Sequence, residues 1–282
     1  MLILVTGVGG QLGYDVCRVL NARKIPCRGV DIEDFDITDR EAVFAYVDGC
    51  RPDAIVHCSA YTAVDRAEDD IDTCMRVNTD GMKHLAEAAS RVGAKLLAVS
   101  TDYVFSGEGK RFYEPDDAVA PRSVYGRSKA LGEAAVRAIL DRHFIVRVSW
   151  LFGKNGNNFV KTMLRLAQTR SELTVVCDQI GSPTYSLDAA ERICDLVLTD
   201  RFGTYHITNE GVCSWAEFAA EIMKQSGKQM QIHSIPTSEY PTRASRPLNS
   251  RMSKDKLEEN GFTRLPHWQD ALARYLKEIQ ES

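Results

Sequence analysis

The stretch MLILVTGVGGQLG, residues 1–13, decides the fold of this chain. The apolar run Leu2–Val5 is typical of a buried strand, and Gly7, Gly10 and Gly13 follow at three-residue spacing. The early glycines permit a close backbone approach that a Cβ would block, and Gly13 allows the next helix to pack near the sheet. The N-terminus of that helix would direct free N–H groups at a pyrophosphate. We therefore expect a strand–loop–helix unit that binds a dinucleotide.

The same alternation of strand and helix continues along the first half of the chain. Short apolar runs, typical of strands, lie between segments with apolar residues at three- and four-residue spacing, which are typical of helices. The predicted strands are Leu2–Val5, Arg28–Val30, Ala54–His57, Lys95–Ser100 and Ile145–Ser149, and the predicted helices are Leu12–Leu20, Ala42–Val47, Met75–Val92 and Tyr125–Leu140.

This alternation predicts an α/β protein with a doubly wound parallel (Rossmann) sheet and a smaller C-terminal α/β substrate lobe. We expect residues 1–150 to form the dinucleotide-binding domain, with a re-entry at 173–198, and the remainder of 151–282 to form the substrate lobe. Thr38 with Glu41, and Ser214 with Glu217, predict capping boxes at two helix starts. The proline-containing stretch Ile235–Asn249 predicts an irregular connection.

Composition excludes several classes of protein. The net charge is −4 without a long basic run, which argues against nucleic acid as a partner. No apolar stretch approaches the roughly 20 residues needed to span a bilayer, and the short N-terminal run is better explained by a strand than by a signal peptide. The eight scattered cysteines are typical of reduced thiols. These features predict a soluble, cytoplasmic protein without a membrane partner.

The end of the second predicted strand carries the residues expected to hold adenosine. Asp31 stands eighteen residues after the last of the three glycines, where an acid can accept hydrogen bonds from the ribose. It would repel the 2′-phosphate of NADP(H), which favours NAD(H), although Arg28 and Lys24 keep NADP(H) open. Asp36 and Ile37 could flank the adenine, and Asp36 could equally cap the next helix.

Tyr125 and Lys129, in YGRSK, are the candidate acid–base pair. A spacing of four places both on one face of a predicted helix. A phenol has a reference pKa of ~10, and an ammonium about 4 Å away would bring it towards about 7 before desolvation takes some of the effect back. Tyr125 would then donate a proton near neutral pH.

Thr101 ends the strand in LLAVSTDYVF, at the sheet edge where doubly wound folds bind ligands. Its hydroxyl could donate a hydrogen bond to a carbonyl that gains negative charge, or simply form a turn.

Four motifs, TGVGGQLG, SAYTAVDRAE, VSTDYVFSG and YGRSK, together resemble the extended short-chain dehydrogenase/reductase family. Later motifs, RVSWLFG, GNNFVKTML, DQIGSPTY and YPTRASRPLNSRM, are similar to its dTDP-4-dehydrorhamnose reductases. The resemblance implies NADH- or NADPH-dependent reduction of the 4-keto group of a dTDP-6-deoxy-hexulose, a sugar-nucleotide substrate. It further implies catalysis by Thr101, Tyr125 and Lys129, cofactor contacts from Gly10, Gln11, Leu12, Asp31, Ser59, Ala60 and Tyr61, and substrate contacts from Asp102, Trp150, Asn158 and Arg246.

Two alternatives stay open at this point. A nucleotide-sugar epimerase or dehydratase with bound NAD would share the motifs, but Tyr103 stands where related dehydratases carry a glutamate, which favours simple reduction. A non-catalytic regulatory subunit, similar to that of methionine adenosyltransferase, would not require the Thr101, Tyr125 and Lys129 set. The resemblance also implies a possible homodimer and, in some members, Mg²⁺ held by glutamates. Asp15 stands where one of these acids is expected, so no metal-ligating residue is assigned, and the sequence leaves open whether Mg²⁺ binds.

Overall fold

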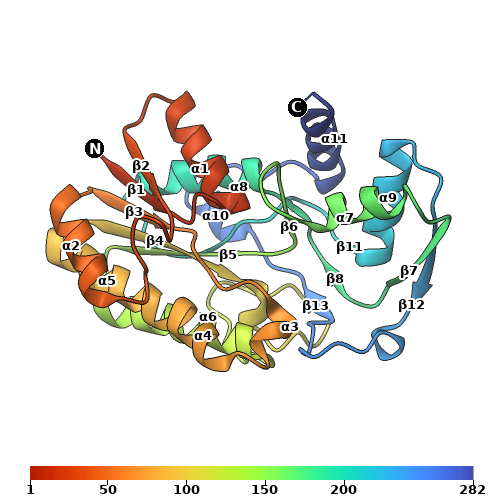
Figure 1. Ribbon diagram of the computed structural model, residues 1–282, viewed down its shortest axis with the longest axis horizontal. Helices are drawn as coiled ribbons and strands as arrows, with labels where there is room; N and C mark the ends of the chain where they lie inside the picture. Colours follow the sequence, from red (N-terminus) through yellow and green to blue (C-terminus); the bar gives the residue numbers. More distant parts are fainter. Residues whose placement is uncertain (282) are drawn as a thin grey trace.

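A six-stranded parallel sheet forms the centre of the protein. The computed structural model describes residues 1–281. The strands are β1 (Ile3–Thr6), β2 (Cys27–Val30), β3 (Ala54–His57), β4 (Lys95–Thr101), β5 (His143–Val148) and β10 (Gly203–His206), in the order β10-β5-β4-β3-β1-β2 (Figure 1). Each strand pairs with its neighbours in parallel register. The predicted fold class, a doubly wound parallel sheet, is confirmed.

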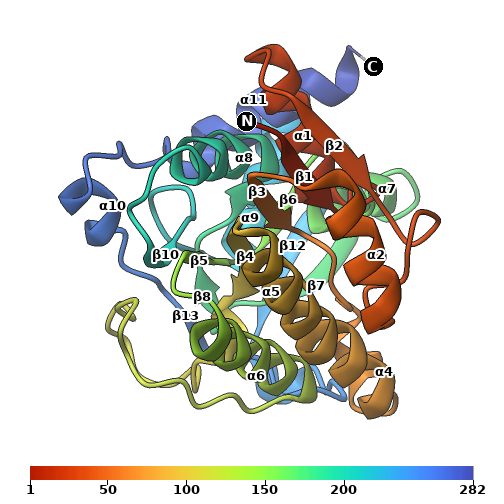
Figure 2. The ribbon, with the colours of Figure 1, turned by 90° about the vertical axis from the view of Figure 1, so that its left-hand side faces the viewer.

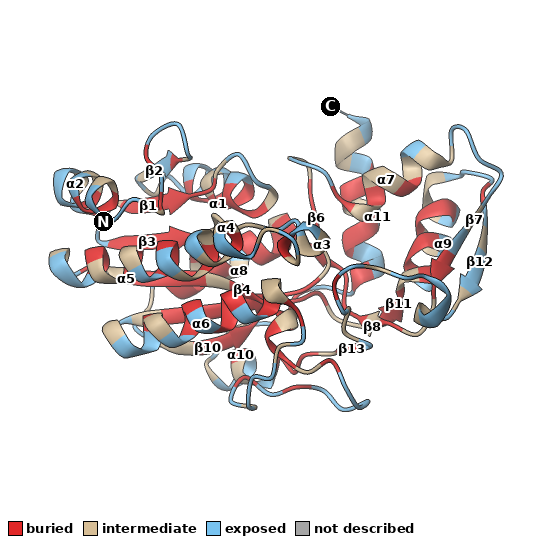
Figure 3. Ribbon diagram, turned by 60° about the horizontal axis from the view of Figure 1, so that its bottom comes forward, coloured by how far each residue is buried: buried red, intermediate tan, exposed pale blue. Residues whose placement is uncertain are grey.

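Helices cover both faces of this sheet. One apolar core joins it to α1 (Gln11–Ala22) and α8 (Ser186–Val197), and another joins it to α2 (Arg40–Cys50), α5 (Gly81–Val92) and α6 (Val124–Ile139). Figure 2 shows α1 and α8 on one side and α2, α5 and α6 on the other. In Figure 3 the strands are buried along most of their length, while the outer helix surfaces are exposed. Burial on both faces explains why the central strands β1 and β3 are mostly apolar, whereas the edge strand β2 is largely exposed.

The order of the strands positions the ligand site. The chain moves from β1 outward to β2 and then returns to β3 on the other side of β1. The connections on the two sides of this point diverge, which opens a crevice at the carboxyl ends of β1 and β3. Gly7 and Asp31 directly follow β1 and β2, and Ser59 is the second residue after β3, so all three lie at this edge.

A smaller lobe follows β5. It contains three short sheets, β11-β8-β13, β12-β7 and β6-β9, together with α7 (Phe159–Leu166), α9 (Trp215–Ser226) and α11 (Trp268–Gln280) around an aromatic-rich core. The strands are β6 (Leu151–Phe152), β7 (Glu172–Val176), β8 (Ile180–Gly181), β9 (Thr184–Tyr185), β11 (Cys213–Ser214), β12 (Gln231–Ile235) and β13 (Asn249–Ser250).

The chain crosses between the sheet domain and the lobe more often than the sequence predicts. The expected re-entry at 173–198 holds for α8, which packs with α1, but not for β7, which pairs with β12 in the lobe. Strand β10 and α10 (Asp255–Glu259), whose Leu257 joins the core beside α1, also return to the main sheet. We keep residue 150 as the proposed boundary.

Of the two predicted capping boxes, one is wrong and the other is confirmed. Thr38 does not cap α2, because Asp39 accepts the backbone N–H groups of Glu41 and Ala42 instead. The capping box of Ser214 and Glu217 is confirmed at α9.

The helix expected at Met75–Val92 is interrupted. It consists of α4 (Ile71–Met75), a π-helical turn at Arg76–Asp80 and α5. The short helix α3 (Val64–Ala67) precedes α4, and a 3₁₀ turn at Asp102–Val104 follows β4. Another 3₁₀ turn, at Thr237–Glu239, lies in the stretch that the sequence predicts to be irregular. Within residues 1–281, no helix is both long enough and apolar enough to cross a membrane.

Candidate active site

The glycine loop forms the floor of a cleft of about 980 Å³ at the carboxyl edge of the sheet. Gly7 has φ +73°, and a Cβ there would come within 2.6 Å of the Ser59 nitrogen. A Cβ on Gly13 would come within 2.3 Å of the Gly7 carbonyl oxygen. The cleft therefore exists in this form only because these positions lack side chains, and the start of α1 faces into it, as a pyrophosphate site requires.

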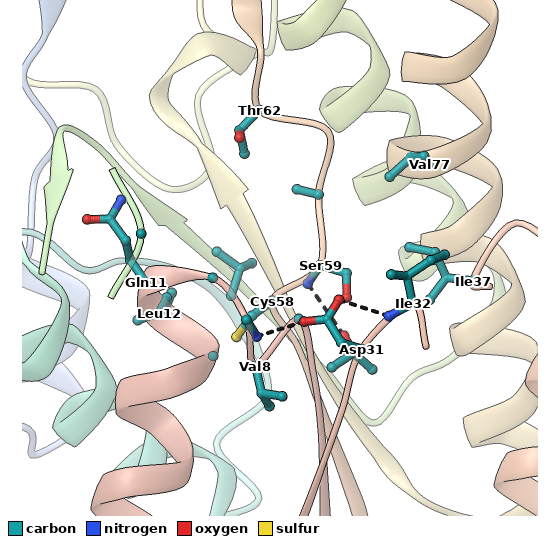
Figure 4. Close-up of a pocket in the computed structure, with 18 of the residues that line it drawn as sticks. Val8, Gln11, Leu12, Asp31, Ile32, Ile37, Cys58, Ser59, Thr62 and Val77 are labelled. Carbon is teal, nitrogen blue, oxygen red and sulfur yellow. Dashed lines mark hydrogen bonds between the residues drawn. The ribbon is translucent and has the colours of Figure 1, made fainter. Parts of the chain in front are cut away.

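The adenosine end of the cleft is acidic. The Asp31 Oδ2 atom accepts the Gly9 N–H at 2.7 Å, so its carboxylate is held against the glycine loop (Figure 4). Glu33, Asp34 and Asp36 also line this end. Asp36 accepts the Thr38 N–H at 2.8 Å and does not cap α2.

Ile37 lies beside these acids and lines the cleft as the sequence predicts. Its side chain packs over Gly81, where a Cβ would come within 2.8 Å of Ile37 Cδ1. The glycine that begins α5 therefore allows this apolar wall to lie close to the helix.

Tyr125 and Lys129 meet the same cleft from α6. Both line it together with Ser59, Ala60 and Ser100. Tyr125 is half-buried, and Lys129 is only 2% exposed. The helix begins at Ser123, whose side chain accepts the Gly126 N–H at 3.1 Å. A Cβ on Gly126 would come within 2.2 Å of the Tyr103 carbonyl oxygen, so this glycine lets the first turn of α6 approach the end of β4.

The electrostatic effect expected on Tyr125 is wrong. Burial raises the pKa of Tyr125 above its ordinary value, and a hydrogen bond with Thr101 opposes this only in part. The groups whose charges act on Tyr125 are Asp102, Tyr103 and Cys74, and Lys129 is not among them. Burial likewise lowers the pKa of Lys129 to about 8, while the charge of Glu133 acts to raise it. At neutral pH the site therefore holds a protonated phenol beside an ammonium.

Thr101 and Tyr103 support Tyr125 from the end of β4. The Thr101 hydroxyl donates to Asp102 at 3.0 Å and accepts the Tyr103 N–H at 3.2 Å. The Tyr103 ring meets Tyr125 edge to face, with centroids 5.5 Å apart. Asp102 is buried, and its carboxylate also accepts the Ser250 hydroxyl. Burial raises the pKa of Asp102 to about 6. Asp102 thus ties β4 to β13 across the two lobes.

With this geometry established, the relationships of the chain follow from comparison with known proteins. The model of the RmlD substrate binding domain family matches residues 1–281. The chain belongs to this family. The spore coat polysaccharide biosynthesis protein SpsK of Bacillus subtilis is 42% identical over 98% of this chain and 97% of that protein. The dTDP-4-dehydrorhamnose reductase of Aggregatibacter actinomycetemcomitans is 40% identical, with 96% of each chain covered.

Solved structures give the same relationship for this member of the RmlD substrate binding domain family. The dTDP-4-dehydrorhamnose reductase of Bacillus anthracis, solved in complex with NADP, superimposes with a TM-score of 0.96 at 42% identity. The match covers 98% of this chain and 99% of that one. The resemblance inferred from the sequence motifs is confirmed.

Three predicted contact residues of this RmlD-family chain have other partners in the structure. Tyr61 is not part of the cleft lining, and its backbone N–H and carbonyl pair with Asn78 in the π-helical turn. Asn158 caps α7 and donates to Gln11 Oε1, the Gly153 carbonyl and Tyr275. Trp150, at φ +50°, stacks on Trp215 with ring centroids 3.7 Å apart. Asn158 positions the loop over α1. A cofactor contact for Tyr61 and a substrate contact for Trp150 stay proposals.

Arg246 lies shortly before β13, beside Tyr103. Its Nη2 atom is 2.6 Å from Asp65 Oδ2, and it shares a small cavity with Tyr103. This position, next to Tyr103 and thus near Tyr125, keeps Arg246 as a candidate contact for the substrate's diphosphate.

The site expected to hold Mg²⁺ in some relatives does not fit a divalent cation here. The carboxylate of Asp15 is buried, accepts the Ser186 hydroxyl and lies 3.6 Å from Arg18, which also pairs with Glu278. An arginine therefore already supplies positive charge to these acids. Within residues 1–281, no group of three or more His, Cys, Asp or Glu side chains could hold a metal ion.

Sequence reasoning missed several residues that line the cleft and one, Asn155, that contacts the glycine loop beside it. Asn155 donates to the Gly9 and Gly10 carbonyls at 2.8 and 3.3 Å, so a loop from the lobe closes over the glycine loop. The Gly153–Asn158 cluster was the available signal, since such residues mark a tight loop. The other lining residues not predicted as contacts are Thr6, Val8, Gly9, Val30, Ile32, Phe35, Cys58, Thr62, Val77, Val99, Ser100, Val148, Leu151, Gly156 and Asn157, together with Glu33 and Asp34.

Proposed function

We propose that this chain reduces the 4-keto group of dTDP-4-dehydro-L-rhamnose to give dTDP-L-rhamnose, with NADH or NADPH as the reductant. The main observation that supports this proposal is that Tyr125 and Lys129 line the same cleft as the glycine loop. The relatives named as dTDP-4-dehydrorhamnose reductases, which match over nearly their whole length, support this substrate.

The chain's own residues would perform the following chemistry. The bound dinucleotide would supply a hydride to the carbonyl carbon. Tyr125 would donate its phenolic proton to the carbonyl oxygen as negative charge develops there. Burial keeps Tyr125 protonated, which is the form that a proton donor needs. Lys129, protonated below pH about 8, would stabilise the phenolate that remains.

The oxygen-rich end of β4 would orient this transfer. Thr101, whose hydroxyl donates to Asp102, acts on the pKa of Tyr125 and would help to orient the phenol. Thr101, which is 5% exposed, would share the developing charge. The lobe would cover the sugar, and the Asn155 loop would keep water from the glycine loop.

The direct test is a turnover assay with purified protein. We expect loss of reduced-nicotinamide absorbance when dTDP-4-dehydro-L-rhamnose is added, in equal amount to the dTDP-L-rhamnose formed. Folded protein that consumes neither NADH nor NADPH with this sugar would overturn the proposal. Tightly bound NAD with no net consumption would indicate an epimerase or dehydratase, and stoichiometric copurification with a synthetase would indicate a regulatory subunit.

We also propose that the chain works in the cytoplasm, without a nucleic-acid or membrane partner. Its net charge of −4 and the lack of a long basic run support this assignment. A homodimer stays a prediction, which light scattering of the purified protein would test.

A further inference from the structure

Glu133 lies one helical turn beyond Lys129 on the inner face of α6. Both side chains are buried, with Lys129 2% exposed and Glu133 fully covered. Residues four apart on a helix are neighbours on its surface, so the carboxylate and the ammonium share one interior region. An unpaired buried carboxylate is very costly, which raises the question of what holds Glu133 in its charged form.

Arg147 on β5 and Arg137 on α6 clamp this carboxylate. Arg147 Nε donates to Glu133 Oε1 at 2.9 Å and its Nη2 donates to Oε2 at 2.8 Å, while Arg137 Nη2 donates to Oε2 at 2.9 Å. Burial acts to raise the pKa of Glu133, but the hydrogen bonds and charge of Arg147 outweigh it and lower that pKa. Glu133 is therefore a carboxylate, not a carboxylic acid, at neutral pH.

Arg147 is fixed in its turn by partners away from the cleft. Its Nη1 donates to the Pro115 carbonyl at 2.9 Å and lies 3.4 Å from His206 Nε2 on β10. Burial, with the charge of Arg147, lowers the pKa of His206 to about 3, so this histidine is neutral. The guanidinium also lies 4.8 Å from the centroid of the Phe105 ring.

The other titratable groups that face Lys129 are neutral at physiological pH. They are His57 on β3, Cys58 directly after β3, Cys74 on α4, and Tyr125. Burial lowers the pKa of His57 to about 3 and raises the pKa values of both thiols and of the phenol. Among the groups of residues 1–281 whose charge acts on Lys129, Glu133 has the largest effect.

We propose that Glu133, clamped by Arg147 and Arg137, is the counter-charge that keeps Lys129 in its ammonium form, and so sets the upper pH limit of catalysis. Glu133 is a positioning residue, since it acts through Lys129 and does not line the cleft. The inference rests on the proposed function only for its catalytic consequence, because the protonation of Lys129 is measurable without any substrate.

The first test reads Lys129 directly. Protein labelled with ¹³Cε-lysine is titrated by NMR, and the Lys129 signal is assigned from its loss in Lys129→Met. In Glu133→Gln we expect the midpoint of this titration to fall by about one pH unit or more, since an opposite charge within about 4–6 Å shifts a pKa by 1–3. An unchanged midpoint in folded Glu133→Gln overturns the inference, whether or not the protein reduces the proposed sugar.

The second test is the pH profile of kcat/KM for the reduction. In Glu133→Gln the alkaline limb of this profile should shift to lower pH by the same amount as the Lys129 titration midpoint. At pH 6 kcat/KM should stay within about threefold of the parent value, and above the new limb it should be about tenfold lower than the parent value. A uniform loss at every pH, with an unmoved limb, would mean a purely structural role and overturn the inference. If the parent protein does not turn over the sugar, the proposed function is wrong, but the NMR titration still tests the effect of Glu133 on Lys129.

Two further variants complete the design. Glu87→Gln removes the same charge from an exposed pair with Arg40 on the far side of α5, and should leave both the titration and the limb unchanged. If Glu133→Gln does not fold because Arg147 is left unpaired, the double variant Glu133→Gln/Arg147→Met removes both buried charges. Its Lys129 midpoint should still fall, since the charge of Glu133 has the largest effect on Lys129, and an unchanged or higher midpoint overturns the inference.

Discussion

At the scale of single residues, burial is the largest influence on the pKa values of Tyr125 and Lys129. Tyr125 and Lys129 lie close enough to share a cleft, yet the pKa of the phenol is raised and that of the ammonium is lowered, each by burial. Both shifts favour the neutral form of the group, because water that would solvate a charge is excluded. The raised pKa of Tyr125 favours reduction, because the phenol that would donate the proton stays protonated.

Tyr125→Phe should remove that donor without removing the site. We expect kcat to fall by about 10²–10⁴, the usual contribution of a positioned general acid, while the affinity for NADH stays within about twofold. Stopped-flow turnover and fluorescence titration of NADH measure the two quantities. Tyr46→Phe, on α2 outside the cleft, is the matched control. Full activity in Tyr125→Phe would exclude the phenol as the proton donor.

The acids at the adenosine end should make the protein prefer NADH. Two like charges about 8 Å apart repel by about 2 kcal/mol at an effective dielectric of ~20, and Asp31, Glu33 and Asp34 would all face a 2′-phosphate. In the sequence, Arg28 was one reason to consider NADPH as the cofactor. In the structure Arg28 does not line the cleft, and its charge acts on Cys50 at the end of α2.

We therefore expect kcat/KM for NADH to exceed that for NADPH by at least about tenfold, and Asp31→Ser to narrow this ratio. Asp48→Asn, which removes an exposed charge from α2, should leave the ratio as it is. A parent protein that uses NADPH better than NADH would contradict this reading of the acids.

At the scale of elements, α1 packs closely against the glycine loop. Gly13 is the third residue of α1 and lies over the Gly7 carbonyl. Gly49, near the end of α2, is exposed, and a Cβ there would meet nothing within 4 Å. The same substitution therefore has opposite consequences in two helices.

Gly13→Ala should destabilise the protein by about 1–3 kcal/mol, as overpacking does, and weaken NADH binding. Gly49→Ala should instead stabilise it by roughly 0.5–1 kcal/mol, because alanine has the better helix propensity. Urea unfolding and NADH titration check both variants. Equal effects of the two substitutions would show that the packing of α1 on its loop does not determine stability here.

The two predicted capping boxes show how local patterns succeed and fail. Ser214 and Glu217 form one at α9, because the chain turns directly into the helix after Ser214. At α2 the same pattern, Thr38 with Glu41, does not form a capping box. Asp39, one residue nearer to the start of the helix, accepts hydrogen bonds from two backbone N–H groups instead. A rule that fixes only spacing cannot choose between adjacent residues that are both good caps.

At the scale of the whole molecule, the C-terminal segment ties the two lobes together. Arg274 on α11 forms two hydrogen bonds of 2.7 Å with Asp188 on α8. Asp188 is 6% exposed and also accepts from Asn209. Because α8 packs with α1 while α11 belongs to the core of the smaller lobe, this pair joins the layer that carries the glycine loop to the lobe that would cover the substrate.

Arg274→Met should lower the free energy of unfolding by about 1–3 kcal/mol, since a buried carboxylate loses its charged partner. Lys277→Met, on the same helix but in an exposed pair with Glu281, should change it by less than about 0.5 kcal/mol. Urea denaturation of both variants measures the difference. Equal values for the two would mean that the Asp188 pair does not contribute to holding the lobes together.

The sequence by itself determined the doubly wound core and the two ends of the cleft. Strand and helix periods, the glycine spacing and the Tyr125–Lys129 interval are local properties, and neighbouring residues along the chain suffice to define them. For the same reason Asp31 could be placed at the adenosine end, where the second strand stops.

The tertiary structure alone decided which distant residues complete the site and how it is charged. The Asn155 loop, the pairing of β7 with β12 and the return of β10 to the main sheet depend on contacts between segments far apart in sequence. The raised pKa of Tyr125 and the clamp on Glu133 depend on how much water is excluded and on which charges face one another. Burial is a property of the packed molecule, and no local pattern of residues contains it.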